Sequence, residues 1–378
     1  IQKVIFSEKS KLVLIDERAF YNCSLKSITI PSSVCEIKNN AFCNCFTLLN
    51  ITFSIDSKLR TIEKDLFSSC QIESFTIPAK VERIKYFNSI NLKHFNFMSK
   101  NDHFVFYNDT FLLGKSDLES DVYDVLIYSR KDVENIIIPS FITKISSNAF
   151  CICDNLKSVE FEPDSKLRVI GKNAFFNCKL ESISIPSSVV KIKKSAFCGN
   201  EHLENFQIPR ESKLRFIGER AFSSTSIKEL FFIPKECILE KGCFYELLSL
   251  KNFNKPPNGY KIFDDNYLLK KSDPKSDIFD VIVMAKCDIE VAIIPSFIKQ
   301  IGPYSFSHCQ KLQTVIFPSD SKLEIIENNA FSYSSIKKIT IPSKVIKIGR
   351  SSFGFCPNLK SIEFSENSKL RIIEQKAF

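Results

Sequence analysis

Cysteine is the residue type whose number and spacing in this chain could most directly do chemistry. The chain has 14 cysteines in 378 residues. Thiols form disulfides in oxidising compartments, or bind zinc where two pairs meet. The C-x-C pairs Cys43/Cys45 and Cys151/Cys153 lack a second pair or a histidine cluster at ligand spacing. We therefore expect no metal and mostly reduced thiols, with some cross-links as the alternative. Seven cysteines share one position, three residues after a recurring phenylalanine: Cys23, Cys45, Cys70, Cys153, Cys178, Cys309 and Cys356.

No group of residues resembles a catalytic site. The four histidines, His94, His103, His202 and His308, share no spacing and belong to no H-E-x-x-H motif. A G-x-S-x-G motif is absent, and the nine glycines form no phosphate-binding loop. Catalysis requires polar groups that converge in a pocket. We predict that the protein is not an enzyme and has no cofactor.

Acidic residues gather in two similar segments and raise the question of calcium. Calcium takes several carboxylate oxygens, usually from a D-x-D-x-D-G spacing, and neither segment has that spacing. We therefore expect solvated turns, with a calcium site as the alternative. The residues are Asp109, Asp117, Glu119, Asp121 and Asp124 in the first segment, and Asp264, Asp265, Asp273, Asp277 and Asp280 in the second.

The elements that position these residues follow a repeat. A phenylalanine, here called the plug, recurs along the chain; Phe150, Phe175, Phe197 and Phe222 are 25, 22 and 25 residues apart. A second period of 155 to 156 residues lies over the first and marks a tandem duplication. Two nested periods of this kind are the signature of stacked repeats. The plugs are Phe20, Phe42, Phe67, Phe87, Phe150, Phe175, Phe197, Phe222, Phe244, Phe306, Phe331, Phe353 and Phe378.

Each repeat unit, or coil, has an L-x-x-I-x-I segment that predicts a strand, as in Leu180–Ile185. Coils of 22 residues continue with I-P-S-S-V, whereas coils of 25 residues have a longer polar turn that ends in S-K-L. We predict a leucine-rich-repeat solenoid of stacked 22- and 25-residue coils. A parallel β-sheet forms one face, and short strands or helical turns form the other.

Two larger segments, residues 101–135 and 258–291, interrupt the repeat. Phe111–Asp117 matches Tyr267–Asp273 at an offset of 156 residues. In each segment two β-rich stretches flank a polar turn, which predicts a β-hairpin. We expect one continuous solenoid over residues 1–378, cut within a coil at both ends. Where alanine is missing before the plug, at Phe87, Phe244 and Phe306, we expect looser packing.

The composition is compatible with a repeat protein. Hydrophobic residues make up 44% and charged residues 25%, which is ordinary for a water-soluble domain. The 36 phenylalanines, beside no tryptophan, are accounted for if each coil buries a plug. No stretch is apolar for the roughly 18–20 residues that a membrane span needs. Any contact with a membrane would therefore come from segments outside this chain.

The repeat L-x-x-I-x-I-P-x-x-V-x-x-I-x-x-x-A-F-x-x-C resembles that of the BspA-like leucine-rich repeat proteins, which occur in oral and gut bacteria and in protozoan parasites. Pro31–Cys45 contains the P-x-x-V, A-F and C elements together. The resemblance covers essentially the whole chain. It implies a surface-exposed protein, such as a surface antigen or adhesin, and no catalytic residues.

Part of the net charge of +9 is ordered by the repeat. Basic residues hold one place in the 25-residue coils, and stacking would align them into a stripe that attracts anionic glycans or membranes. The alternative is a solvated edge that keeps solenoids from pairing. The candidate basic stripe consists of Lys58, Arg60, Lys166, Arg168, Lys213, Arg215, Lys322, Lys369 and Arg371.

The outward positions of the predicted strands form a second candidate surface, because solenoids bind partners on extended faces. Serine and threonine are also common on exposed strands without any function. The candidate binding surface consists of Ser27, Thr29, Asn50, Thr52, Ser74, Thr76, Ser158, Glu160, Ser182, Ser184, Asn205, Gln207, Thr340 and Glu363. Lys338 and Ser361 hold the same kind of position.

We predict a non-enzymatic adhesion or recognition module at the cell surface, a monomer that binds protein or glycan on host or neighbouring cells. The first alternative is an intracellular, cytoplasmic scaffold for protein–protein interaction, which many unpaired thiols favour. A weaker alternative is a polyanion-binding protein that uses the basic stripe. Nucleic acid is not expected as a partner, because the aromatic residues that would stack on bases are committed to the core.

Overall fold

Each coil folds into a long strand and a short strand, joined by tight turns. The structure, a computed structural model, describes residues 1–378 except 8, 88, 90, 100, 230–231 and 252–255. The chain divides into two compact units, Ile1–Leu180 and Glu181–Phe378. Within the described ranges both units consist of strands and turns, with no helix. The predicted solenoid is confirmed, and the second side of each coil carries short strands rather than helical turns.

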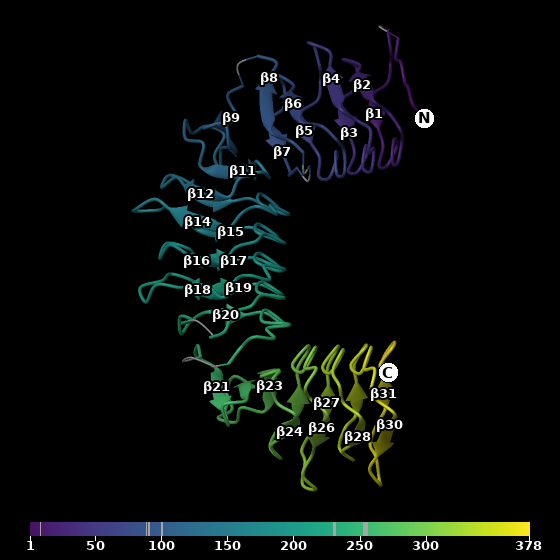
Figure 1. The fold of residues 1–378 in the computed structure, drawn as a ribbon, viewed down its shortest axis with the longest axis vertical. Helices are drawn as coiled ribbons and strands as arrows, with labels where there is room; N and C mark the ends of the chain where they lie inside the picture. The colour runs from purple at the N-terminus through teal and green to yellow at the C-terminus, as the bar shows by residue number, and fades with distance from the viewer. Residues whose placement is uncertain (8, 88, 90, 100, 230–231, 252–255) are drawn as a thin grey trace. The chain divides into compact units, whose positions relative to one another are not determined.

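In the first unit, long and short strands stack in separate parallel rows (Figure 1). The long strands are β2 (Ser27–Ile30), β4 (Asn50–Phe53), β6 (Ser74–Ile77), β8 (His94–Phe97), β12 (Asn135–Ile138) and β14 (Ser158–Phe161). The short strands are β1 (Leu14–Ile15), β3 (Glu36–Ile37), β5 (Thr61–Ile62), β7 (Arg83–Ile84), β13 (Lys144–Ile145) and β15 (Val169–Ile170).

The second unit repeats this arrangement. Its long strands are β16 (Ser182–Ser184), β18 (Asn205–Gln207), β24 (Val291–Ile293), β26 (Thr314–Ile316), β28 (Lys338–Ile341) and β30 (Ser361–Phe364). Its short strands are β17 (Lys191–Ile192), β19 (Phe216–Ile217), β20 (Ile238–Leu239), β25 (Gln300–Ile301), β27 (Ile325–Ile326), β29 (Lys347–Ile348) and β31 (Ile372–Ile373). Long strands alternate exposed and buried residues, which is what one core face requires.

The two interruptions are antiparallel, as predicted, but each has three strands rather than two. In the first unit they are β9 (Phe104–Tyr107), β10 (Phe111–Gly114) and β11 (Val125–Ser129). In the second unit they are β21 (Tyr260–Phe263), β22 (Tyr267–Lys270) and β23 (Val281–Ala285). The last strand of each meander pairs in parallel with the short strand of the next coil, so the meander joins the row of short strands.

The plug phenylalanines form the centre of the core. The rings of Phe150 and Phe175 stack at 4.8 Å, and those of Phe306 and Phe331 at 4.9 Å. Phe87, Phe244 and Phe306 are buried like the other inner plugs, so the expectation of looser packing there was wrong. Each buried ring adds roughly 1.5–3 kcal/mol of hydrophobic stabilisation. The plug column therefore carries much of the stability of both units.

The chain turns sharply on both sides of the plug through residues of positive φ. Asn40 and Asn44, two residues before and after Phe42, have φ of 59° and 62°. Asparagine tolerates this left-handed conformation better than other residues that carry a side chain. The sequence pattern gave no separate signal for these turns, because many residue types occupy them.

The cysteine position satisfies backbone groups of the neighbouring coil. The thiols of Cys45, Cys70 and Cys178 donate to the carbonyl oxygens of Phe20, Phe42 and Phe150, at 2.9, 3.1 and 3.0 Å. Where the position holds Asn200, its side chain bonds the plug carbonyl of its own coil instead. All 14 cysteines are free thiols.

Candidate functional site

The predicted outward residues of the long strands lie at the surface in both units. All 14 are exposed except Thr76 and Ser158, which are half-buried. Neighbouring strands bring several of them together. The hydroxyls of Thr29 and Thr52 are 2.9 Å apart, and Ser182 lies opposite Asn205. On these strands the candidate binding surface is a row of small polar groups that hydrogen-bond along the solenoid.

The sequence analysis left out outward residues on four long strands. His94 and Asn96 on β8 continue the polar row, since Asn96 donates to Ser74 Oγ at 2.9 Å. The others are Asn135 and Ile137 on β12, Val291 and Ile293 on β24, and Thr314 and Ile316 on β26. The 156-residue offset could have found the last pair, because Thr314 and Ile316 correspond to Ser158 and Glu160.

Strands β24 and β26 carry an exposed apolar patch, defined here as Val291, Ile293 and Ile316. All three side chains are exposed, and Ile293 lies directly opposite Ile316 in the parallel ladder. The face continues into Lys338 on β28, which forms an ion pair of 2.6 Å with Glu363 on β30. Apolar residues that adjoin one another on a surface and have a polar rim are typical of protein-binding sites.

A groove of about 940 Å³ adjoins the apolar patch. Strands β26 and β28 pair only through Thr314 and Lys338, whereas β28 and β30 pair over four residues. The ladder opens because β26 belongs to a 25-residue coil, whose longer turn follows Phe317. Ile316, Phe317 and Pro342 contribute apolar surface to the groove, and Thr340 lies on its other strand.

The residues of the basic stripe are exposed, but they do not form one uninterrupted row. The backbone explains their position: the amides of Lys166, Lys213 and Lys369 donate to Ser140, Ser187 and Ser343 of the preceding coil, at 2.8 Å each. Arg60 is paired with Glu82 of the next coil. It is the one member of the stripe in an ion pair within the described part of the chain. Lys322 and Lys369 lie two coils apart, as expected, whereas a meander separates Lys58 from Lys166.

A ridge of aromatic side chains was missed by the sequence analysis. His308, Tyr333 and Phe355 follow their plugs by two residues, at φ of 57° to 59°. Their rings stack at 4.4 and 4.8 Å, and Phe355 is 70% exposed. Corresponding positions elsewhere hold Asn44, Asn177 or Gly199, which suit a left-handed backbone. Aromatic residues there cost about 1–2 kcal/mol each, so the ridge is a second candidate for contact with a partner.

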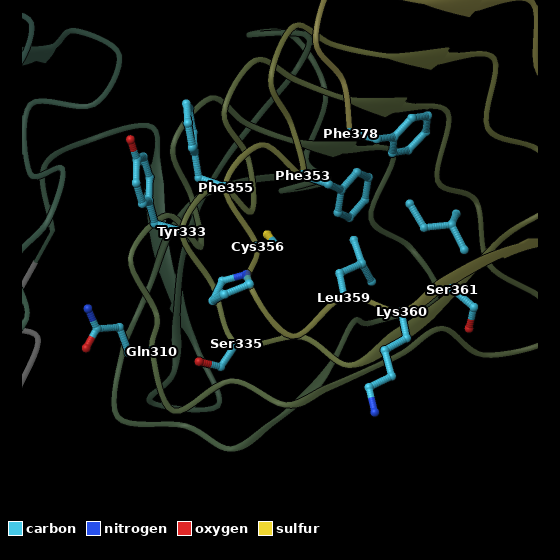
Figure 2. Close-up of a pocket in the computed structure, with 12 residues that line it drawn as sticks. Gln310, Tyr333, Ser335, Phe353, Phe355, Cys356, Leu359, Lys360, Ser361 and Phe378 are labelled. Carbon is cyan, nitrogen blue, oxygen red and sulfur yellow. The ribbon is translucent and has the colours of Figure 1, made fainter.

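The pocket beside this ridge, of about 910 Å³, has another explanation. Figure 2 shows Phe353, Phe378 and Leu359 on one side and Tyr333 and Phe355 on the other. Leu359 and Ile362 hold repeat positions that are buried in an inner coil, as at Leu312 and Val315. The apolar lining is therefore made of the core positions of the last coil, and the repeat itself accounts for it.

The acidic segments contain one structural carboxylate each. Asp124 is buried and accepts hydrogen bonds from Ser116 N, Ser116 Oγ and Thr143 Oγ1, at 2.8, 2.7 and 2.6 Å. Burial raises the pKa of Asp124, but these donors outweigh burial and hold the pKa below its usual value. Asp280 accepts the equivalent bonds from Ser272, and Lys299 Nζ lies 3.8 Å away.

Neither metal ligands nor membrane helices are found in the described ranges. No group of three or more His, Cys, Asp or Glu side chains there could hold a metal ion. The same residues include no helical segment suited to crossing a bilayer.

These features define a leucine-rich-repeat solenoid, and comparison with known proteins gives the family. The model of the BspA type leucine rich repeat region matches residues 13–125, 120–251 and 281–378. The chain therefore belongs to the BspA-type leucine-rich repeat family, and its repeats are those of a protein-interaction module. No curated protein matches the chain.

Solved structures of bacterial leucine-rich repeat proteins resemble this chain. One from Eubacterium ventriosum is 18% identical, with a TM-score of 0.55 over 86% of this chain and 81% of that one, and it supports the fold alone. One from Bacteroides ovatus is 24% identical over 96% and 78%, with a TM-score of 0.41. A leucine rich cell surface protein from Faecalibacterium prausnitzii is 19% identical over 94% and 83%, with a TM-score of 0.32. The last two TM-scores are too low to support an argument.

Proposed function

We propose that the chain is a non-enzymatic recognition module of a cell surface, which binds a protein on a host or neighbouring cell. The observation that carries this proposal is the apolar patch of Val291, Ile293 and Ile316. Charged or polar side chains would keep an exposed strand face soluble, and aliphatic ones expose apolar area to water. Burying that area against a partner gains about 25 cal/mol per Å².

A protein suits this face better than a glycan does. The three aliphatic side chains offer no hydrogen-bond donor or acceptor and no flat aromatic ring for a sugar. Thr314, Thr340 and the Lys338–Glu363 pair supply a polar rim beside them. An apolar centre with a polar rim is the usual anatomy of a protein–protein interface.

The surface location is supported by the family to which the chain belongs, whose resemblance implied surface-exposed proteins. The alternative, an intracellular scaffold, is supported by the 14 free thiols. Both alternatives use the same strand face. Fusion of the complete protein to a reporter that an impermeant protease can remove from intact cells separates them.

A binding assay on cultured epithelial cells tests the partner class. Labelled chain is added to untreated cells, to protease-treated cells and to glycosidase-treated cells. We expect protease to abolish binding and glycosidase to leave it. The double substitution V291N/I316E, which converts the patch toward the residues of β12 and β14, should weaken binding at least about tenfold, or 1.4 kcal/mol. Loss of binding after glycosidase alone would replace the protein partner with a glycan.

The basic stripe supports a second candidate, the binding of acidic glycans. Its exposed lysines attract polyanions whatever the fine structure of the ligand. Retention on heparin should then fall when Lys58, Lys166 and Lys213 are changed to Glu together. Unchanged retention would remove this candidate and leave the proposal for the apolar patch untouched.

A further inference from the structure

One lysine lies inside the column of thiols. Lys131 is 7% exposed, its Nζ donates to Ala149 O at 3.3 Å, and it lies 4.9 Å from the centre of the Tyr128 ring. The neighbouring carboxylate, Asp132, is held by Arg130 at 2.6 Å. No described carboxylate pairs with Lys131. A buried ammonium group requires an anion or several acceptors nearby.

Two thiols from adjacent coils lie beside this lysine. Cys153 and Cys178 are buried and occupy the same position in coils 25 residues apart. Backbone bonds of 2.8 Å from Phe150 N to Ala174 O and from Ile152 N to Phe176 O hold these coils together. Such coils are about 4.8 Å apart, and a disulfide needs Cα atoms roughly 4.4–6.8 Å apart. The spacing therefore suits a disulfide without movement of the backbone.

Hydrogen bonds connect the three side chains. The Cys178 thiol donates to Phe150 O at 3.0 Å and is hydrogen-bonded to Cys153, which also contacts Lys131. Burial raises the pKa of Cys153, but the bond from Cys178 and the charge of Lys131 outweigh it and lower the pKa below its ordinary value. Burial and the bond to Cys153 raise the pKa of Cys178. One thiol thus favours the thiolate and the other stays protonated.

We propose that Cys153 and Cys178 form a redox-active dithiol, in which Lys131 stabilises the Cys153 thiolate and a disulfide closes between adjacent coils. The oxidant is a low-molecular-weight disulfide. Cys153 Sγ attacks one of its sulfurs, forms a mixed disulfide and releases one small thiolate, which takes up a proton. Cys178 then loses its proton and attacks Cys153 Sγ, and the second small thiol leaves. Two protein thiols are oxidised, and one small disulfide is reduced to two thiols.

The second copy shows that the fold does not require this arrangement. At an offset of 156 residues, Cys287, Cys309 and Ser334 hold the places of Lys131, Cys153 and Cys178. Ser334 Oγ lies 3.4 Å from Cys356 Sγ, so a hydroxyl is accommodated in the column. Substitution of Cys178 by Ser, or of Lys131 by Cys, therefore copies residues that the same coil geometry already holds.

Oxidised glutathione, the probe of the test, is added to the native 378-residue chain at neutral pH. Samples are quenched by alkylation and mapped by mass spectrometry. Because both sulfurs are buried, we expect Cys153–Cys178 to react more slowly than the exposed Cys35. The disulfide should form about tenfold more slowly in K131M, because less thiolate is present, and near the wild-type rate in K131R. The Cys45–Cys70 pair, which has no lysine beside it, should react equally in all three chains.

The C178S variant separates the two steps. We expect it to stop at a glutathione adduct on Cys153, and an unfolded K131M would leave this test intact. Three results would overturn the proposal: both thiols still free when Cys35 is fully modified, a stable adduct on Cys153 in the wild-type chain, or equal rates in K131M and wild type.

Discussion

The strand faces β12–β14 and β24–β26 occupy equivalent places in the two copies but differ in chemistry. In the first copy the outward residues are Asn135, Ile137, Ser158 and Glu160, and Ser158 donates to Asn135 at 2.6 Å. In the second copy they are Val291, Ile293, Thr314 and Ile316. The core beneath is alike, since Val159 and Val315 are both buried. The duplication keeps the inward residues that packing demands and leaves the outward residues free to acquire a partner.

The meanders show the same contrast between a shared frame and local difference. Both copies hold a buried aspartate by the amide and hydroxyl of one serine. The third partner is Thr143 in the first copy and Lys299 in the second. Shared bonds therefore set the turn between the second and third strands, and the neighbouring coil adjusts the charge.

The plugs should be where the two copies agree most and where substitution costs most. Phe175→Ala and Phe331→Ala each remove a fully buried ring that stacks on another plug. We expect each to cost about 3–5 kcal/mol in the free energy of unfolding. Urea denaturation followed by circular dichroism measures this, with the exposed Phe355→Ala as the control. Costs below about 1 kcal/mol would contradict the shared core.

Removal of the buried carboxylate should have the next largest effect. Asp124→Ala leaves Ser116 and Thr143 without their acceptor, and we expect a loss of about 2–4 kcal/mol. Asp280→Ala should cost a similar amount, because the two bonds from Ser272 are equivalent. The exposed Asp121→Ala is the control and should change the urea midpoint little. Equal midpoints for Asp121→Ala and Asp124→Ala would show that the turn does not depend on this carboxylate.

The contribution of Asp124 should also depend on pH. Its pKa in the folded chain lies below the value of about 3.9 in unfolded chains. The stabilisation is therefore fully present above that value and is lost as the pH falls through the folded pKa. The difference in unfolding free energy between the wild type and Asp124→Asn should shrink below about pH 4. Urea midpoints between pH 7 and pH 3 measure it, and a constant difference would contradict this account.

The sequence predicts the repeat well, because the plug spacing and the alternation of β2 or β28 report one buried side directly. It does not predict the third meander strand β9, the positive φ beside each plug, or the open ladder between β26 and β28. These depend on how neighbouring coils stack rather than on the pattern within one coil. The same limit applies to the site. Ile316 continues the apolar pattern of a strand, and only the register shows that it faces outward beside Ile293.

The most direct measurement compares Ile137→Gln with Ile293→Gln in the cell-binding assay. The two side chains are matched, at 57% and 60% exposed on equivalent strands, so each substitution should change the unfolding free energy by less than about 0.5 kcal/mol. The account predicts that Ile293→Gln weakens binding about fivefold to tenfold, by the lost burial of one aliphatic side chain, and that Ile137→Gln leaves it unchanged. Equal losses in both variants, or no loss in Ile293→Gln, would contradict the claim that the second copy's strand face recognises the partner.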